Sequence, residues 1–179
     1  VPKVYSDAND LINDYDINAV YIATPPGSHM VYALAVIKSG KPVYIEKPMA
    51  VNYAECLKIN QTAQKYKVPV FVAYYRRALP GFLKVKDLIE TGSIGKVRLI
   101  QIQLFKTPTK DEISDILPWR VDPALSGGGH FFDLACHQID YFDYLFGPVL
   151  KVKSIVMNQG GLYKAEDFVT AEFVFADEI

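Results

Sequence analysis

The sequence predicts an α/β protein in which the second half of a doubly wound parallel sheet is followed by an α+β region with a mainly antiparallel sheet. Over residues 1–75, helical segments alternate with short apolar runs, which are typical of parallel strands covered on both faces. Farther along, apolar and polar residues alternate with a period of two, as in antiparallel strands with one covered face. The change places the predicted domain boundary after Arg76, between domains 1–76 and 77–179.

The first domain is predicted to contain strands separated by helices. The predicted strands are Ala19–Thr24, Pro42–Glu46 and Val68–Tyr74. The predicted helices are a short one that follows the capping residues of Ser6–Asp10 and reaches about Asp14, one over Ser28–Ser39, and one from Asn52 to about Tyr66. Short links between such elements imply right-handed crossovers and a parallel sheet.

The second domain is predicted to contain two helices and an antiparallel sheet. The helices are Pro80–Thr91, which ends at Gly92, and Gly129–Phe146, which is expected to cover the sheet. The strands are one that opens at Gly95 and alternates Ile100, Ile102 and Leu104 with glutamines, one through Leu150, Val152 and Val156, and one through Val169, Ala171, Phe173 and Phe175. The polar loop Thr107–Pro118 is expected to lie over the cleft.

Composition excludes several classes of function. The chain has 179 residues, a formal net charge of -1 and no run rich in lysine and arginine, so we expect no nucleic-acid partner. No apolar stretch reaches the ~18 residues that cross a membrane, and nothing resembles a signal peptide. Cys56 and Cys136 lack framework spacing, which predicts buried free thiols and a cytoplasmic location. A chain that opens on Val1 without methionine, and closes just after a strand, predicts a longer protein.

The tripeptide Glu46-Lys47-Pro48 places a lysine at the carboxyl end of an apolar strand, the edge at which open α/β sheets bind ligands. The proline after Lys47 favours extended backbone and stiffens the path of the lysine out of the strand. An ammonium at this position can donate to a substrate hydroxyl and to a ribose, and can stabilise a developing alkoxide. The alternative is a solvated lysine at a strand end.

A second polar cluster follows three glycines at positions 127–129, where the backbone could approach a ligand closely. Asp133 and His137 are four residues apart and share one face of the predicted helix. His137 can exchange a proton near neutral pH, and Asp133 could orient it or bind the substrate. The alternative is a core histidine paired with a helical carboxylate. His130 lies on the same side and competes for the role, although it sits in the first turn. We expect no metal site, because the histidines and cysteines lack ligand spacing.

Candidate binding residues lie at other strand and helix ends. The turn from Thr24 and Pro25 to His29 follows a strand and opens a helix, whose free N–H groups suit a phosphate or a carboxylate, although an ordinary turn has the same composition. The pairs Arg76-Arg77 and Trp119-Arg120 could meet a phosphate, a sugar or a ring, although interdomain salt bridges and packing explain them equally well. No Gly-x-Gly-x-x-Gly follows a strand, so these residues alone do not establish a dinucleotide.

Together, the motifs Ala23-Thr24-Pro25-Pro26-Gly27-Ser28-His29, Gly40–Pro48 and Ser126–His137 resemble those of the Gfo/Idh/MocA family of oxidoreductases. The resemblance implies a Rossmann domain that binds NAD or NADP, then an α/β domain with a large, mostly antiparallel sheet, and a homo-oligomer formed through that sheet. It implies catalytic roles for Lys47, Asp133 and His137. Cofactor contacts are expected from Thr24, Pro25, His29, Glu46, Lys47, Arg76, Trp119 and Arg120. The family's glycine-rich phosphate loop is absent from the sequence.

The expected activity is hydride transfer between a nicotinamide cofactor and a hydroxyl or carbonyl of a sugar, an inositol or a related polyol. Two alternatives on the same fold are a non-enzymatic NAD(P)-binding regulator and a glycosidase that uses tightly bound NAD. The presence of Lys47, Asp133 and His137 together favours the enzyme, because a sensor needs only the binding turn.

Overall fold

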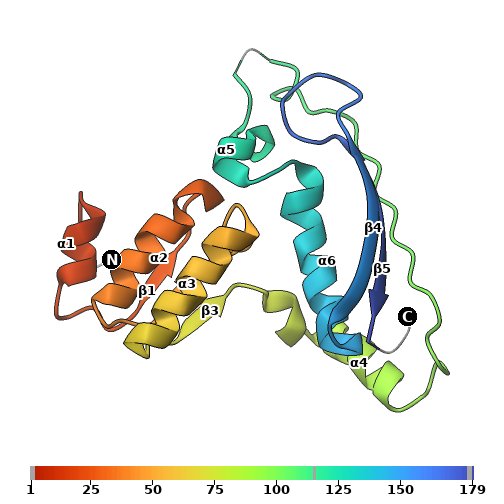
Figure 1. The fold of residues 1–179 in the computed structure, drawn as a ribbon, viewed down its shortest axis with the longest axis horizontal. Coiled ribbons are helices and arrows are strands. Elements are labelled where there is room, and N and C mark those ends of the chain that lie inside the picture. Colours follow the sequence, from red (N-terminus) through yellow and green to blue (C-terminus); the bar gives the residue numbers. More distant parts are fainter. Residues whose placement is uncertain (1–2, 115, 177–178) are drawn as a thin grey trace.

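The computed structural model describes residues 3–114, 116–176 and 179, which form two α/β halves joined by one linker (Figure 1). The first half contains α1 (Ala8–Asn13), β1 (Val20–Ile22), η1 (Pro26–Ser28), α2 (His29–Lys38), β2 (Val43–Ile45), α3 (Tyr53–Tyr66) and β3 (Val70–Val72). These strands pair in parallel in the order β1-β2-β3, which confirms the predicted parallel sheet.

Local chemistry explains the helix boundaries in this half. The carboxylate of Asp7 accepts the N–H of Asn9 and caps α1, and the side chain of Asn52 accepts the N–H of Glu55 and caps α3. Gly40, at φ +81°, follows the end of α2 in a conformation that favours glycine.

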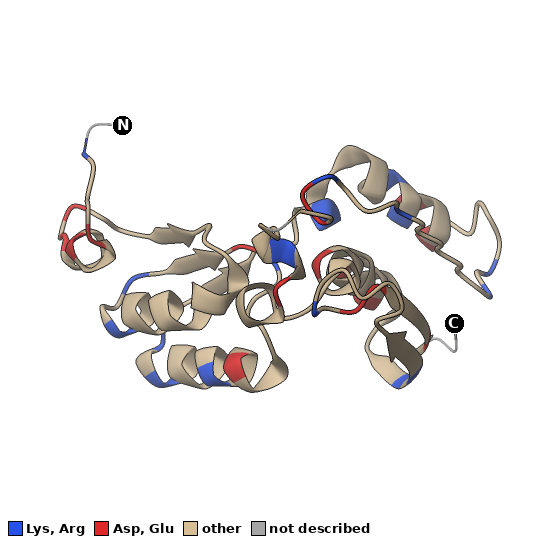
Figure 2. Ribbon diagram, turned by 90° about the horizontal axis from the view of Figure 1, so that it is seen from above, with Lys and Arg blue, Asp and Glu red and all other residues tan. Residues whose placement is uncertain are grey.

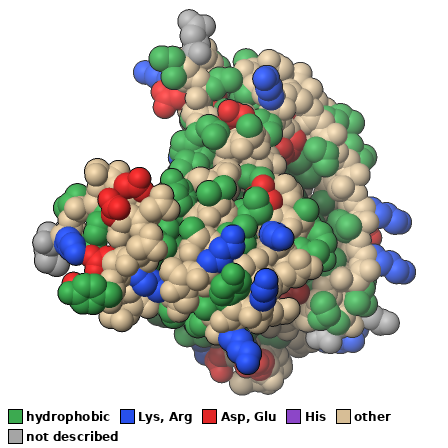
Figure 3. All heavy atoms as spheres, turned by 60° about the vertical axis from the view of Figure 1, so that its left-hand side comes forward, with side chains coloured by type: hydrophobic (Ala, Val, Ile, Leu, Met, Phe, Trp, Pro, Cys, Tyr) green, Lys and Arg blue, Asp and Glu red, His purple; other side chains and the backbone are tan. Residues whose placement is uncertain are grey.

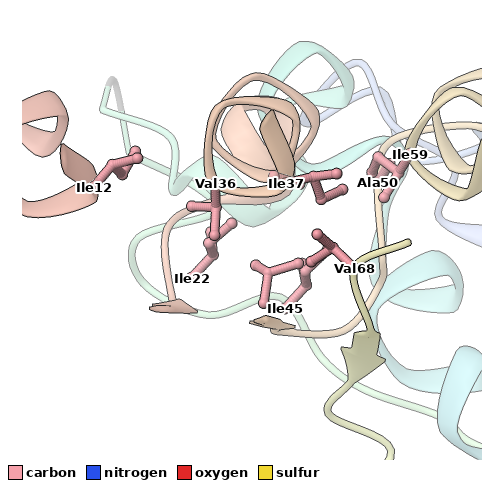
Figure 4. Close-up of a cluster of buried hydrophobic side chains, with 10 residues drawn as sticks. Ile12, Ile22, Val36, Ile37, Ile45, Ala50, Ile59 and Val68 are labelled. Atoms are coloured by element: carbon pink, nitrogen blue, oxygen red, sulfur yellow. The ribbon is translucent and has the colours of Figure 1, made fainter. Parts of the chain in front are cut away.

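The core of the first half lies between the sheet and helices α2 and α3. Ile22 and Ile45 point from the strands toward Val36 and Ile37 of α2, and Ile59 of α3 closes the same cluster (Figure 4). These side chains are almost fully buried, and each such residue stabilises the fold by roughly 1.5–3 kcal/mol.

The expectation that both faces of this sheet are covered was wrong. Tyr21, Tyr44 and Phe71 lie in register on the face opposite α2 and α3, and all three are exposed. Successive right-handed crossovers that progress in one direction place every helix on the same side, so three adjacent strands receive one layer of helices. We call these residues the aromatic stripe.

The second half is built around one long helix. It contains η2 (Tyr75–Ala78), α4 (Pro80–Glu90), η3 (Trp119–Val121), α5 (Pro123–Ser126), α6 (His130–Phe146), β4 (Val149–Met157) and β5 (Phe168–Phe175). Strands β4 and β5 form an antiparallel pair, as predicted. Phe142 and Phe146 of α6 pack against Phe175 with ring centroids 6.1 and 6.4 Å apart, so α6 covers the β5 side of the pair.

Two expectations for this half were wrong. Residues 95–109, all of which the structure describes, form neither a helix nor a strand, although Ile100, Ile102 and Leu104 alternate with glutamines in the sequence. A strand needs a hydrogen-bonded neighbour as well as alternation, and Leu104 is exposed. Every residue of β4 is also exposed, rather than every second one. Exposed hydrophobic side chains are visible in Figure 3.

Glycines allow the two halves to approach closely. A Cβ on Gly27 in η1 would lie 2.8 Å from the carbonyl oxygen of Ala124 in α5. A Cβ on Gly127 would lie 2.8 Å from the backbone of Val51. We call these two contacts the glycine seam.

None of the described helices has the length and apolar character needed to span a membrane. Acidic and basic residues are distributed over both halves (Figure 2).

Candidate active site

Lys47 leaves the carboxyl end of β2 and reaches the first turn of α6. Its Nζ donates to Oδ1 of Asp133 at 2.6 Å and to the backbone carbonyl of Asp133 at 2.9 Å. The residues are 86 positions apart in the chain, and their side chains are only 15% and 20% exposed. A charge-assisted bond therefore joins the two halves at the carboxyl edge of the parallel sheet.

Arg120 approaches the same carboxylate from η3. Its Nε lies 3.9 Å from Oδ2 of Asp133, and its guanidinium carbon lies 4.4 Å from the ring centroid of Trp119. The Arg120 side chain is 54% exposed. The predicted pair Trp119-Arg120 thus lies at the rim of the Lys47–Asp133 cluster.

His137 follows Asp133 by about one helical turn and is 4% exposed. Its Nδ1 is buried and has no hydrogen-bond partner among the described residues. Burial, and then the positive charges of Lys47 and Arg76, lower the pKa of His137 to about 4. The imidazole is therefore neutral at pH 7 and able to accept a proton.

Aromatic rings from the interdomain linker surround this histidine. The ring centroids of Tyr74 and Tyr75 lie 6.2 and 5.3 Å from that of His137, both in edge-on geometry. Arg76 follows these tyrosines in η2, and its guanidinium carbon lies 5.7 Å from the ring centroid of Phe82. Burial raises the pKa of the Tyr74 hydroxyl, which therefore stays protonated.

The turn from Thr24 to His29, after β1, encloses a buried histidine. His29 is fully buried, with Nε2 2.7 Å from the carbonyl oxygen of Thr24 and Nδ1 3.0 Å from that of Pro48. The ring therefore lies between the turn after β1 and the turn after β2, and the side chain is not presented at the surface. Thr24 and Pro25 are exposed, and the Thr24 hydroxyl accepts a bond from Ser28 at 2.7 Å.

Glu46 precedes Lys47, and its side chain reaches the neighbouring strand β1. Its Oε1 accepts the hydroxyl of Tyr21 on β1, and its Oε2 accepts the backbone N–H of Lys47 at 3.2 Å. The carboxylate thus joins two neighbouring strand ends.

The competing histidine is engaged elsewhere. The Nε2 atom of His130 meets Oε1 of Glu112, a carboxylate that is 4% exposed in the loop Thr107–Pro118. That loop is therefore attached to the first turn of α6. Of the histidines, His137 is the one with a buried ring nitrogen left unpaired among the described residues.

Sequence analysis did not identify some of the contacts that hold this site together. Arg77 donates from Nε to Oδ2 of Asp140 at 2.8 Å and fixes α6 to the linker, which agrees with the salt-bridge alternative for the arginines at the end of the third strand. The partner, Asp140, was not predictable, because residues 63 positions apart give no periodic signal. Glu166 supplies the acceptors at the start of α6. A signal for it existed, because a helix that begins after three glycines lacks a cap of its own and needs an acceptor from elsewhere.

A hollow of about 340 Å³ lies along α6 beside the cluster, with walls that are mostly apolar. Its lining residues are Tyr74, Phe131, Phe132, Cys136, Ile139, Asp140 and Asp143. Lys47, Asp133 and His137 are not among them, so the hollow borders the cluster without containing it. Cys136, like Cys56, is a free thiol that is half-buried rather than buried.

A parallel sheet whose carboxyl edge meets a lysine, an aspartate and a buried histidine defines a Rossmann-type α/β protein with a candidate active site at that edge. Residues 1–74 match the family model described as "Oxidoreductase family, NAD-binding Rossmann fold", and residues 82–179 match that of the "GFO/IDH/MocA C-terminal domain". The chain belongs to the Gfo/Idh/MocA family of oxidoreductases, which confirms the resemblance inferred from its motifs.

Relatives of known name span the same region. An oxidoreductase of Formosa agariphila is 45% identical over 83% of this chain and 46% of its own length. The myo-inositol 2-dehydrogenase of Thermotoga maritima is 30% identical over 82% of this chain and 41% of its own. The crystal structure of the WlbA dehydrogenase from Bordetella pertussis, in complex with NADH and UDP-GlcNAcA, superposes with a TM-score of 0.84 at 28% identity, over 97% of this chain and 50% of that one. The chain thus spans about half the length of these relatives.

Proposed function

We propose that this protein is an NAD(P)-dependent oxidoreductase that transfers a hydride between a nicotinamide and a hydroxyl or carbonyl of a sugar, an inositol or a related polyol. The observation that carries the proposal is the bond between Lys47 and Asp133, next to the neutral imidazole of His137. The relatives named for myo-inositol and crystallised with a UDP-sugar support the class of substrate.

The side chains that are present fit a nicotinamide and a polyol. Lys47 donates two of its three N–H groups to Asp133, and the third can meet a substrate oxygen or a ribose hydroxyl. Thr24, Pro25, Glu46, Arg76, Trp119 and Arg120 lie at or near the same sheet edge and would contribute to holding the cofactor. When bound, the nicotinamide supplies the hydride acceptor or donor.

The chain's own residues handle the proton. In the oxidation direction, His137 takes the proton of the substrate hydroxyl as its carbon loses a hydride, and it becomes an imidazolium while a carbonyl forms. Lys47 donates to the same oxygen and stabilises the charge that develops on it. Asp133 fixes the direction of the ammonium, and hydride transfer requires that such positioning hold the reacting atoms within roughly 3–3.5 Å.

The exposed β4 supports a second part of the proposal, which is self-association of the protein through its antiparallel sheet.

Lys47→Ala and His137→Ala, made in the full-length protein, test the proposed activity. Each is expected to lower turnover by at least ~100-fold, because general acid–base groups typically contribute that much. The measurement is nicotinamide absorbance with a panel of inositols, sugars and sugar nucleotides. Lys58→Ala, an exposed lysine on α3, is the matched control and should leave turnover unchanged.

Three results would contradict the proposal. Turnover of both variants near that of the native protein would remove the assigned roles. Cofactor binding without turnover of any polyol would favour a regulator, and release of a sugar without net cofactor reduction would favour an NAD-dependent glycosidase.

A further inference from the structure

Helix α6, which carries Asp133 and His137, begins without a capping side chain of its own. Its N-cap residue is Gly129, and the two residues before it are also glycines. The first N–H groups of a helix have no partners within the helix, so their acceptors must come from another part of the chain.

Glu166, in the connection between β4 and β5, supplies those acceptors. Its Oε2 accepts the N–H of Gly129 at 2.7 Å, and its Oε1 accepts the N–H of Phe132 at 3.4 Å. The carboxylate also places a negative charge at the positive end of the helix dipole.

The connection that carries Glu166 is itself well ordered by hydrogen bonds. The Asp167 carboxylate accepts the N–H groups of Gln159 at 2.7 Å and Gly160 at 2.6 Å. The Asn158 amide donates to the carbonyl of Ala165 at 2.9 Å. The carboxylate of Glu166 therefore lies in a segment whose conformation is fixed by hydrogen bonds.

The glycines before α6 make room for this carboxylate. A Cβ on Gly129 would lie 2.3 Å from the backbone oxygen of Glu166 and 3.1 Å from its carboxyl carbon. A Cβ on Gly128 would lie 3.3 Å from Oε1 of Glu166. The sequence predicted that a ligand would approach the glycines at positions 127–129 closely. In the structure, Glu166 of the same chain makes that close approach at Gly128 and Gly129.

A continuous series of hydrogen bonds links Glu166 to Lys47. Glu166 accepts the N–H of Gly129, whose carbonyl accepts the N–H of Asp133 at 3.1 Å, and the Asp133 side chain accepts Lys47. Loss of the bond from Gly129 to Glu166 would free Gly129, the residue at which the helix begins. Asp133 is bonded directly to Gly129, so its position would be affected next.

We propose that Glu166 is a positioning residue: by capping α6 it sets the location of Asp133 and His137 relative to Lys47. The catalytic consequence rests on the proposed function, whereas the structural consequence does not. A misplacement of about 1 Å can cost on the order of 100-fold in rate, so a cap that sets the start of the helix affects turnover without touching the substrate.

The test compares Glu166→Ala, Glu166→Gln and Glu172→Ala in the full-length protein. Glu172 is an exposed carboxylate on β5 and serves as the matched control. In Glu166→Ala we expect amide hydrogen exchange at Gly129 and Phe132 to be about fivefold faster or more, and the NMR signal of the Lys47 ammonium to shift. We expect kcat to fall about tenfold or more while the cofactor KM stays within about twofold. Glu166→Gln keeps one acceptor and should recover part of both effects.

Unchanged exchange at Gly129 and Phe132 would overturn the capping role. Faster exchange with an unchanged Lys47 signal would overturn the positioning role, and so would faster exchange with unchanged kcat in an active enzyme. If the native protein turns over no polyol, the proposed function fails while exchange and the Lys47 signal still decide the role of Glu166. If Glu166→Ala does not fold, the same readouts in Glu166→Gln decide it.

Discussion

The environment of His137 combines burial with two nearby cations. Desolvation disfavours the imidazolium, and Lys47 and Arg76 disfavour it further, while Asp133 and Asp140 oppose them. The pKa of about 4 means that the ring is a neutral proton acceptor over the whole physiological range. Activity that requires neutral His137 should therefore persist into acid and fall only as pH approaches about 4.

Arg76→Met should move the acid limb of the kcat/KM profile to higher pH. Removal of a positive charge near His137 makes protonation of the ring easier, so its pKa rises and the neutral form is lost sooner as pH falls. The measurement is kcat/KM against pH, and the position of the limb is independent of any loss in cofactor affinity. Arg98→Met, at an exposed arginine, is the control, and a limb that stays in place in Arg76→Met would contradict this account.

Single residues differed in how far their pattern predicted them. Lys47 and Asp133 were predicted to serve one site, because a strand end and a helical spacing identify each of them as a candidate. Their direct bond was not, because no local pattern relates residues 86 positions apart. His29 shows the opposite case, since its place in a binding turn suggested a ligand contact, and the structure buries its ring between two backbone carbonyls.

Helix α6 is held at its start by Glu166 and again beyond its middle. There, Arg77 of the linker donates two side-chain hydrogen bonds to Asp140, and its guanidinium carbon lies 5.0 Å from the ring centroid of Tyr144. The two partners differ in exposure, 39% for the Arg77 side chain and 8% for that of Asp140. That difference in exposure decides whether substitution of Arg77 or of Asp140 lowers the free energy of unfolding more.

Arg77→Ala should destabilise the protein more than Asp140→Ala. The first change leaves a buried carboxylate without its partner, at a cost of about 3 kcal/mol or more. The second leaves a guanidinium that water can reach, at a cost of about 1–2 kcal/mol. Urea denaturation of both variants measures the difference, and equal losses, or a larger loss in Asp140→Ala, would contradict the explanation. Lys96→Ala, at an exposed cation, is a control for loss of charge alone.

Elements with their own boundary signals were predicted well. Asp7 and Asn52 mark the starts of α1 and α3, and Gly40 follows the end of α2. Residues 95–109 were not, because alternation describes the two faces of a strand but not the presence of a neighbouring strand. Short segments such as η2 were also missed, since a single turn leaves no periodic pattern.

The glycine seam determines how closely the two halves can meet. At Gly27 the nearest atoms belong to the backbone of α5, which cannot move aside as a flexible side chain could. By contrast, a Cβ on Gly81 in α4 would meet nothing within 4 Å, and its backbone is helical. These two glycines therefore form a matched pair for a test.

Gly27→Ala should weaken the docking of the halves, whereas Gly81→Ala should not. We expect a loss of about 1–3 kcal/mol in unfolding free energy for the first change, in line with overpacking, together with reduced turnover. The second should be neutral or stabilising by up to about 1 kcal/mol, because alanine is the better helix former. Urea denaturation and nicotinamide assays on both variants provide the comparison, and similar behaviour of the two would rule out a tight seam at Gly27.

The architecture followed from the order of elements, but the coverage of the sheet did not. Alternation of helices and apolar strands predicted the parallel sheet, since short links allow few topologies. The apolar character of a strand does not indicate on which face of the sheet the next helix packs. The exposure of the aromatic stripe, Tyr21, Tyr44 and Phe71, was therefore not predicted. The predicted boundary after Arg76 and the cofactor contacts of the site residues stay predictions.

The bond between Lys47 and Asp133 also bears on how the centre is assembled during folding. Contacts between distant positions form only after the intervening chain has closed its loop, and these two residues are 86 positions apart. A chain in which only one half has folded lacks the centre entirely. The return of the proposed activity during refolding would therefore report the docking of one half against the other, and not the earlier folding of either half.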